Sequence, residues 1–132
     1  MIKHIWLALG FCIFPFFSFA YGESSRSAIE IITTDFQFIP NVWSVNRGEA
    51  TSLLLSNHGK QEHEWVLLKL GTKVTLPFDA DDEAKVFWEI EVGPTIKKKE
   101  IFITPLKAGT YDIVCGKPRH IERGMKGTLI VK

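Results

Sequence analysis

The chain has 132 residues, which is enough for one domain with a proper core and too few for a second core of ordinary size. Its 16 lysine and arginine residues nearly balance 15 aspartate and glutamate residues, so the formal net charge is +1. This balance lacks the clustered positive charge of a nucleic-acid-binding domain, and no nucleic-acid partner is expected.

The N-terminus has the pattern of a secretory signal peptide. Lys3 precedes an apolar stretch from Ile5 to Phe17, and small residues follow at Ser18 and Ala20. We therefore expect a signal peptide over residues 1–20 and export of the remainder to the periplasm or out of the cell. An uncleaved membrane anchor is the alternative, but the apolar stretch contains Pro15 and is shorter than the roughly 20 residues of a spanning helix. No membrane span is expected after removal of the signal peptide.

Residues 21–132 consist of short candidate strands separated by turn residues, with no long stretch at helical spacing. In chain order, the predicted strands are Ala28–Thr34, Ala50–Ser56, His63–Leu68, Val86–Val92, Glu100–Thr104, Thr110–Cys115 and Gly127–Val131. Turn signals fall between them at "NRGE", "NHGK", "VGP" and "KAG". Asp79 or Asp81 is expected to cap a short helical turn before Val86. The pattern favours one all-β domain, an antiparallel sandwich or barrel.

The strand Thr110–Cys115 leads into the most informative loop of the chain. Alternation along the strand places Tyr111, Ile113 and Cys115 on one face, which we expect to point into the core. The loop "GKPRHIERGM" then connects Cys115 with the final strand. Because binding residues concentrate on loops held by a rigid sheet, this loop is the first candidate for a functional site.

The loop gathers rare side chains. Without residues 1–20, Cys115 is the only cysteine and Met125 the only methionine, and His120 lies midway between them. A lone cysteine in an oxidising compartment has no disulfide partner and is open to oxidation, so we expect something to protect it. Four residues separate each neighbouring pair of these three side chains, so a loop that folds back over the strand end can aim all of them at one point.

Thiolate, imidazole and thioether are soft ligands that suit copper, especially when a second imidazole completes a trigonal plane with a distant axial methionine. His63 is the candidate for the second imidazole, because it begins a strand directly after the turn "NHGKQE" and so lies at a sheet end, as Cys115 does. His58 lies inside that turn and is expected to be solvated. The sequence therefore predicts one copper ion, as Cu(I) or Cu(II), bound by His63, Cys115, His120 and Met125.

Each of these residues also has an ordinary interpretation. A lone cysteine is often a small apolar core residue, and a methionine often fills a gap in the core. Zinc would more often be given a second cysteine or a third histidine than a methionine. A cysteine hydrolase needs an activated thiolate and an oxyanion hole, and nothing in the sequence suggests a nucleophile at a helix start. Their combination in one loop favours copper, and no enzymatic activity is expected.

Three stretches of the sequence resemble the cupredoxins, the blue-copper family. They are "DFQFIPNVWSVNRGE", "SNHGKQEHEWVL" and "PLKAGTYDIVCGKPRHIERGMKGTLIVK". Within the family, the chain is most similar to small periplasmic cupredoxin-like domains, including those associated with copper tolerance or iron uptake. The resemblance implies that residues 21–132 form a cupredoxin-like domain, a Greek-key β-sandwich. It also implies one copper at the end of that sandwich, with His63, Cys115, His120 and Met125 as ligands.

The resemblance further implies a periplasmic blue-copper protein that transfers electrons. Two alternatives are a copper-handling or copper-tolerance protein and a cupredoxin-like component of a metal-uptake system. Around His120 the sequence reads "KPRHIER", in which Lys117, Arg119 and Arg123 outweigh Glu122. Such a cationic rim would steer an acidic redox partner protein. We expect the protein itself to be a monomer.

Overall fold

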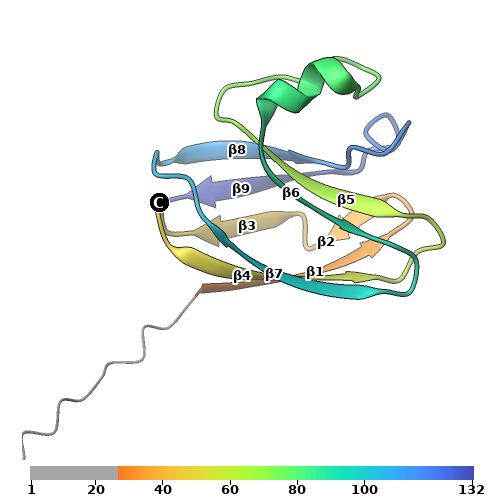
Figure 1. Cartoon of the computed structure of the whole chain (residues 1–132), viewed down its shortest axis with the longest axis horizontal. Coiled ribbons are helices and arrows are strands. Elements are labelled where there is room, and N and C mark those ends of the chain that lie inside the picture. The colour runs from red at the N-terminus through yellow and green to blue at the C-terminus, as the bar shows by residue number, and fades with distance from the viewer. Residues whose placement is uncertain (1–26) are drawn as a thin grey trace, which may run out of the picture.

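Two β-sheets packed face to face make up residues 27–132, the part of the chain that the computed structural model describes (Figure 1). The predicted signal peptide over residues 1–20 lies outside these described residues. Within residues 27–132, no helix is long and apolar enough to cross a membrane. The expectation of an all-β sandwich is confirmed.

The first sheet has four strands and the second has five. In spatial order, the first contains β2 (Gln37–Ile39), β1 (Ser27–Thr34), β4 (Ala50–Asn57) and β7 (Lys97–Ile103). The second contains β3 (Val42–Val45), β9 (Lys126–Val131), β8 (Gly109–Val114), β5 (His63–Leu68) and β6 (Val86–Val92). Most neighbouring strands are antiparallel, as expected, but the pairs β1 with β4 and β3 with β9 are parallel. The chain crosses to the second sheet as β3 and then returns, which brings β4 beside β1 in the same direction.

The strands that the sequence predicts best are runs of six or seven residues bounded by turn residues. His63–Leu68 and Val86–Val92 have the predicted bounds. The short strands β2 and β3 escaped the strand prediction, because three or four residues are too few to show a period. β7 begins at Lys97 rather than at the predicted Glu100. Its three lysines gave no apolar strand pattern, because they lie on the exposed edge of the first sheet. Lysines on an edge strand discourage pairing with other chains.

The core between the sheets is rich in aromatic rings. Trp65 on β5 is wholly buried, and the centroid of its ring lies 5.7 Å from that of Trp43 and 6.1 Å from that of Phe102. Ile113 and Cys115 point into the same core, as the alternation predicted. Because Phe102 belongs to the first sheet and Trp65 to the second, the edge-to-face contact between them joins the two layers.

The segment between β5 and β6 covers the outer face of the second sheet. As a result, β5 is buried on both faces, with Leu67 inside the sandwich and Val66 and Leu68 under this segment. Val74 and Phe78 of the segment pack against the outer cluster. A strand covered on both sides loses the polar and apolar alternation that marks a half-exposed strand.

The covering segment ends in a short 3-10 helix, η1 (Ala80–Lys85), the green coil at the top of Figure 1. Asp79 caps η1, as predicted: its carboxylate accepts a hydrogen bond of 2.9 Å from the Asp81 N–H. The Asp82 carboxylate in turn accepts from the Asp79 N–H, which completes a capping box. Lys85 Nζ lies 2.6 Å from the buried Asp82 carboxylate and neutralises it.

The fold brings the start of β5 and the end of β8 to one end of the sandwich. These strands are antiparallel neighbours, so His63 at the start of β5 lies near Cys115, which follows β8 directly. The turn between β1 and β2 reaches the same end, and a backbone hydrogen bond ties β1 to the loop before β5. The loop between β8 and β9, at the right of Figure 1, completes this end of the molecule.

Two neighbouring residues of β9 test the assignment of faces. Leu129 is 0% exposed in the core, whereas Ile130 is 37% exposed on the outer face. Leu129→Ala is expected to lower the free energy of unfolding by about 2–5 kcal/mol, because it leaves a cavity in the core. Ile130→Ala should change it by about 0.5 kcal/mol or less. Urea unfolding of both variants measures the difference, and equal losses would contradict the strand's orientation.

Candidate metal centre

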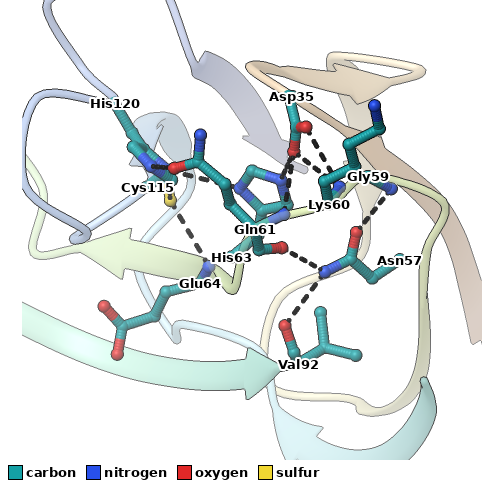
Figure 2. Close-up of polar contacts among 10 residues, drawn as sticks. All are labelled: Asp35, Asn57, Gly59, Lys60, Gln61, His63, Glu64, Val92, Cys115 and His120. Carbon is teal, nitrogen blue, oxygen red and sulfur yellow. Dashed lines mark hydrogen bonds and ion pairs between the residues drawn. The ribbon is translucent and has the colours of Figure 1, made fainter. Parts of the chain in front are cut away.

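Three side chains meet at this end of the sandwich. His63 Nδ1 lies 3.3 Å from His120 Nδ1, and Cys115 Sγ lies 3.3 Å from the same His120 atom. All three atoms lie within 4.8 Å of one another. His63 and Cys115 are 0% exposed and His120 is 4% exposed. The structure therefore brings together three of the four predicted ligands, with their donor atoms converging (Figure 2).

His63 is oriented by a carboxylate behind it. Its Nε2 lies 2.9 Å from Asp35 Oδ1, in the turn between β1 and β2. A hydrogen bond from the Lys60 N–H keeps the pKa of Asp35 below its usual value, with a further contribution from His63. A charged Asp35 can only accept, so the proton of the His63 ring resides on Nε2. His63 Nδ1 is then the nitrogen available to a metal ion, and it faces the same space as His120 Nδ1 and Cys115 Sγ.

The loop before β5 is built around the Asp35 carboxylate. The Lys60 N–H donates to both carboxylate oxygens at 3.1 and 3.0 Å, and the Gln61 N–H donates to Oδ1 at 3.2 Å. Gly59 is required here, since a Cβ at this position would lie 2.3 Å from Asp35 Oδ1. Asn57 holds the loop by accepting from the Gly59 N–H at 2.8 Å and donating to the Gln61 carbonyl at 2.7 Å (Figure 2).

His120 is held in the same way but by a neutral group. Its Nε2 lies 3.1 Å from the side-chain oxygen of Gln61, so this nitrogen donates and Nδ1 faces inward as an acceptor. The ring of Phe36 packs edge to face on His120, with 4.9 Å between centroids. Burial, followed by the proximity of His63, lowers the pKa of His120, so the ring is neutral at pH 7. A neutral imidazole is the form that binds a metal.

Cys115 offers its sulfur from the first position after β8. Its N–H donates to the Met125 carbonyl at 3.1 Å, and its Sγ accepts from the Glu64 N–H at 3.4 Å. Burial raises the pKa of the Cys115 thiol to about 11, against smaller opposing effects of nearby backbone N–H groups. The thiol is therefore protonated in the metal-free protein, and a metal ion must displace this proton to bind the sulfur.

A defined turn sets the spacing between His120 and Met125. The Met125 N–H donates to the His120 carbonyl at 3.0 Å, and the Gly124 N–H donates to the Ile121 carbonyl at 2.9 Å. This pair of bonds is a Schellman motif, and its left-handed position is filled by Gly124 with φ of 90°. Met125 is wholly buried in the core cluster that contains Cys115. Its role as a ligand stays a prediction.

The charged rim around the loop differs from the sequence-based expectation. Lys117 forms ion pairs with Glu62, at 2.5 Å, and with Glu91 from β6, so it is not a free cation. Arg123 lies over the ring of Phe36, 4.4 Å from its centroid. Across residues 27–132, no carboxylate lies within ion-pairing distance of Arg119 or Arg123. The positive charge available to a partner reduces to these two arginines, and an acidic partner stays a prediction.

Glu64 adds a carboxyl group on the Cys115 side of the centre. Its side chain is half-buried against Gly116, where a Cβ would lie 2.3 Å from Oε2. Burial, and then the negative charge of Glu89, raise the pKa of Glu64 to about 7.

His58 takes no part in the centre. It is exposed, as predicted from its place in the polar turn.

Two residues that hold the imidazoles were missed by the sequence interpretation. Asp35 is 28 residues from His63 in sequence, and its position in a turn suggests only a turn residue. Gln61 precedes His63 by two residues, and this closeness in sequence was the only indication, a weak one, that Gln61 lies near the centre. The Asp35 contact depends on the β1–β2 turn packing against the loop before β5, and the Gln61 contact depends on that loop meeting the loop between β8 and β9.

The arrangement suits metal binding better than nucleophilic catalysis. Two imidazoles and one sulfur face a common point, and each of these side chains is fixed by a hydrogen bond from behind or by the backbone. A buried thiol with a raised pKa is a poor nucleophile, whereas a cysteine enzyme lowers the pKa of its thiol and exposes it to substrate.

Cys115 in the metal-free protein is expected to react slowly with iodoacetamide at neutral pH. A pKa of about 11 leaves a thiolate fraction roughly two orders of magnitude below that of an ordinary thiol. The alkylation rate at Cys115, followed by peptide mass spectrometry, should increase with pH and should increase sharply in denaturant. Rapid alkylation of the native protein at pH 7 would instead indicate an activated thiol.

Comparison with known proteins identifies the family. The family described as "Cupredoxin-like domain" matches residues 6–131. The copper-resistant cuproprotein CopI of Rubrivivax gelatinosus is 28% identical over 117 residues, which cover 84% of this chain and 69% of CopI.

Solved structures of auracyanins have the same fold. Dithionite-reduced auracyanin from Roseiflexus castenholzii has a TM-score of 0.66 and 23% identity, covering 81% of this chain and 98% of that protein. Auracyanin A of Chloroflexus aurantiacus, a blue copper protein, has a TM-score of 0.69 and 23% identity, with coverage of 81% and 99%. The sandwich is thus of the cupredoxin type, as the sequence resemblance implied. Since the family match spans nearly the whole chain, the protein belongs to the cupredoxin-like domain family.

Proposed function

We propose that the protein binds one copper ion through His63, Cys115, His120 and Met125 and works as an electron carrier outside the cytoplasm. The convergence of two imidazole Nδ1 atoms and one cysteine sulfur within 4.8 Å carries the proposal. Copper, when bound, supplies the ability to accept and release one electron. The residues themselves bind the ion, exclude water and hold their positions.

The chemistry of the donor set fits copper. A thiolate and two imidazoles are the set found in blue-copper sites, where a methionine is a weak axial ligand. Asp35 is turned away from the common point, toward His63 Nε2, and so does not supply an oxygen ligand that would favour a harder ion. Zinc would need a stronger fourth donor than a thioether.

The support around the ligands fits electron transfer. Each imidazole is held at Nε2, and the cysteine sulfur accepts a backbone N–H. Side chains fixed in this way change position little when the charge of the ion changes, which keeps the reorganisation small. His120 is the only one of the three with any exposed surface, so it is the ligand through which electrons would pass.

Copper handling is the second candidate function, because CopI is named as a copper-resistant protein and resembles this chain over most of its length. A carrier must retain its ion through many cycles of oxidation and reduction, whereas a handling protein must give it up. The near-complete burial of the three donors favours retention.

Copper-loaded protein is expected to show intense visible absorption from thiolate-to-copper charge transfer, with one copper per chain. Cys115→Ser should abolish this absorption, because a hydroxyl cannot replace the thiolate. His58→Ala is the matched control, since His58 is exposed and lies only five residues from His63. Its spectrum should be unchanged, whereas His63→Ala should lose the band.

The same sample separates the alternatives. A wild-type protein that binds copper without the intense band would contradict a blue-copper site. If the band persists during repeated redox cycles in the presence of a copper chelator, the carrier function is supported. If the chelator removes the copper within a few cycles, copper handling becomes the better account.

The location outside the cytoplasm rests on the signal-peptide pattern of residues 1–20. Mass spectrometry of the periplasmic fraction should find a chain that begins near Tyr21 or Glu23, because cleavage is expected after Ala20 or Gly22. Full-length protein recovered from the membrane fraction would favour an uncleaved anchor instead.

A further inference from the structure

The two imidazoles of the centre are held by groups of different charge. His63 Nε2 bonds to the Asp35 carboxylate at 2.9 Å, whereas His120 Nε2 bonds to the neutral amide of Gln61 at 3.1 Å. The carboxylate thus lies behind the more buried ring and the amide behind the ring nearer the surface. Figure 2 shows Asp35 beside His63 and Lys60, and Gln61 reaching toward His120.

The Asp35 carboxylate occupies a built position. Three bonds from the Lys60 and Gln61 N–H groups fix its two oxygens, and Gly59 leaves the space that they fill. The Asp35 side chain is 26% exposed and the His63 side chain 0%. A charge in such partial burial is screened less by water and salt than a charge on the open surface. In the described part of the chain, His63 is the only basic side chain within ion-pairing distance of Asp35.

We propose that Asp35 is a positioning residue that orients His63 and, through its negative charge, favours the oxidised over the reduced state of the centre. This inference rests on the proposed copper site. A carboxylate bonded to the far nitrogen of a metal-binding imidazole makes the ring a stronger donor, and its charge stabilises a doubly charged ion more than a singly charged one. On reduction, one electron from an external donor converts Cu(II) to Cu(I). No bond to Asp35 is broken.

Asp35→Asn tests the charge while preserving the shape. The asparagine oxygen can still accept from His63 Nε2, but the negative charge is lost. Affinity for Cu(II) is expected to fall about 10- to 100-fold, as for other partners of metal ligands, and affinity for Cu(I) should fall less. Each tenfold difference between the two losses raises a one-electron reduction potential by about 59 mV.

Asp112→Asn is the matched control. It removes the same formal charge from a carboxylate that pairs with Lys73, at 2.8 Å, and has no bond to the three donor side chains. Its reduction potential should stay near that of the wild type. If Asp35→Asn and Asp112→Asn shift the potential equally, the effect is one of net charge and the proposal is overturned.

Gln61→Glu provides the reciprocal change. It places a carboxylate behind His120 where the wild type has an amide, so the reduction potential should fall, opposite to the effect of Asp35→Asn. A potential that increases in both variants would mean that any disturbance of the loop has the same effect, which also overturns the proposal.

The orienting role has a test without copper. In the ¹⁵N NMR spectrum of the metal-free protein, the His63 proton should reside on Nε2, and in Asp35→Ala this preference should be lost. An unchanged tautomer in a folded Asp35→Ala variant would refute the orienting role. If the wild type takes up no copper, the proposed function fails, while this spectrum still decides whether Asp35 orients His63.

Discussion

Three metal-binding atoms, two imidazole nitrogens and one cysteine sulfur, share one small buried space at the end of the sandwich. The residues around them hold each ring by its outer nitrogen, so that the inner nitrogens face this space. The Nδ1 atoms of both rings face this space, so each buried Nε2–H must find a hydrogen-bond acceptor outside the trio. Asp35 and Gln61 supply these acceptors, and both depend on the loop that Asn57 and Gly59 hold in shape. The turn of the first sheet thereby orients a ligand in the second.

The same construction connects binding with electron transfer. The antiparallel pairing of β5 with β8 fixes the positions of His63 and Cys115, and the Schellman turn fixes His120 relative to Met125. The aromatic core below and the covering segment above leave the strands little freedom to move. A site whose donors are already gathered before the ion arrives pays little in rearrangement when the ion binds or changes its charge.

The sequence predicted the parts of this structure that depend on local pattern. Short apolar runs between turn residues located β5 and β6, alternation along β8 gave the inward direction of Cys115, and the concentration of rare side chains in one loop pointed to the centre. What it could not predict depends on packing between distant segments. Asp35 meets His63 only because a turn of the first sheet packs on the loop before β5, and Lys117 is ion-paired because that loop and β6 bring Glu62 and Glu91 beside it.

The central claim is that these donors form one copper site with the positions that they already have. X-ray absorption at the copper edge, measured on the loaded protein in both oxidation states, tests it most directly. The account predicts one thiolate sulfur and two imidazole nitrogens around copper, in the same number and at similar distances in the oxidised and the reduced protein. A spectrum with nitrogen and oxygen neighbours but no sulfur, or loss of an imidazole on reduction, would contradict it.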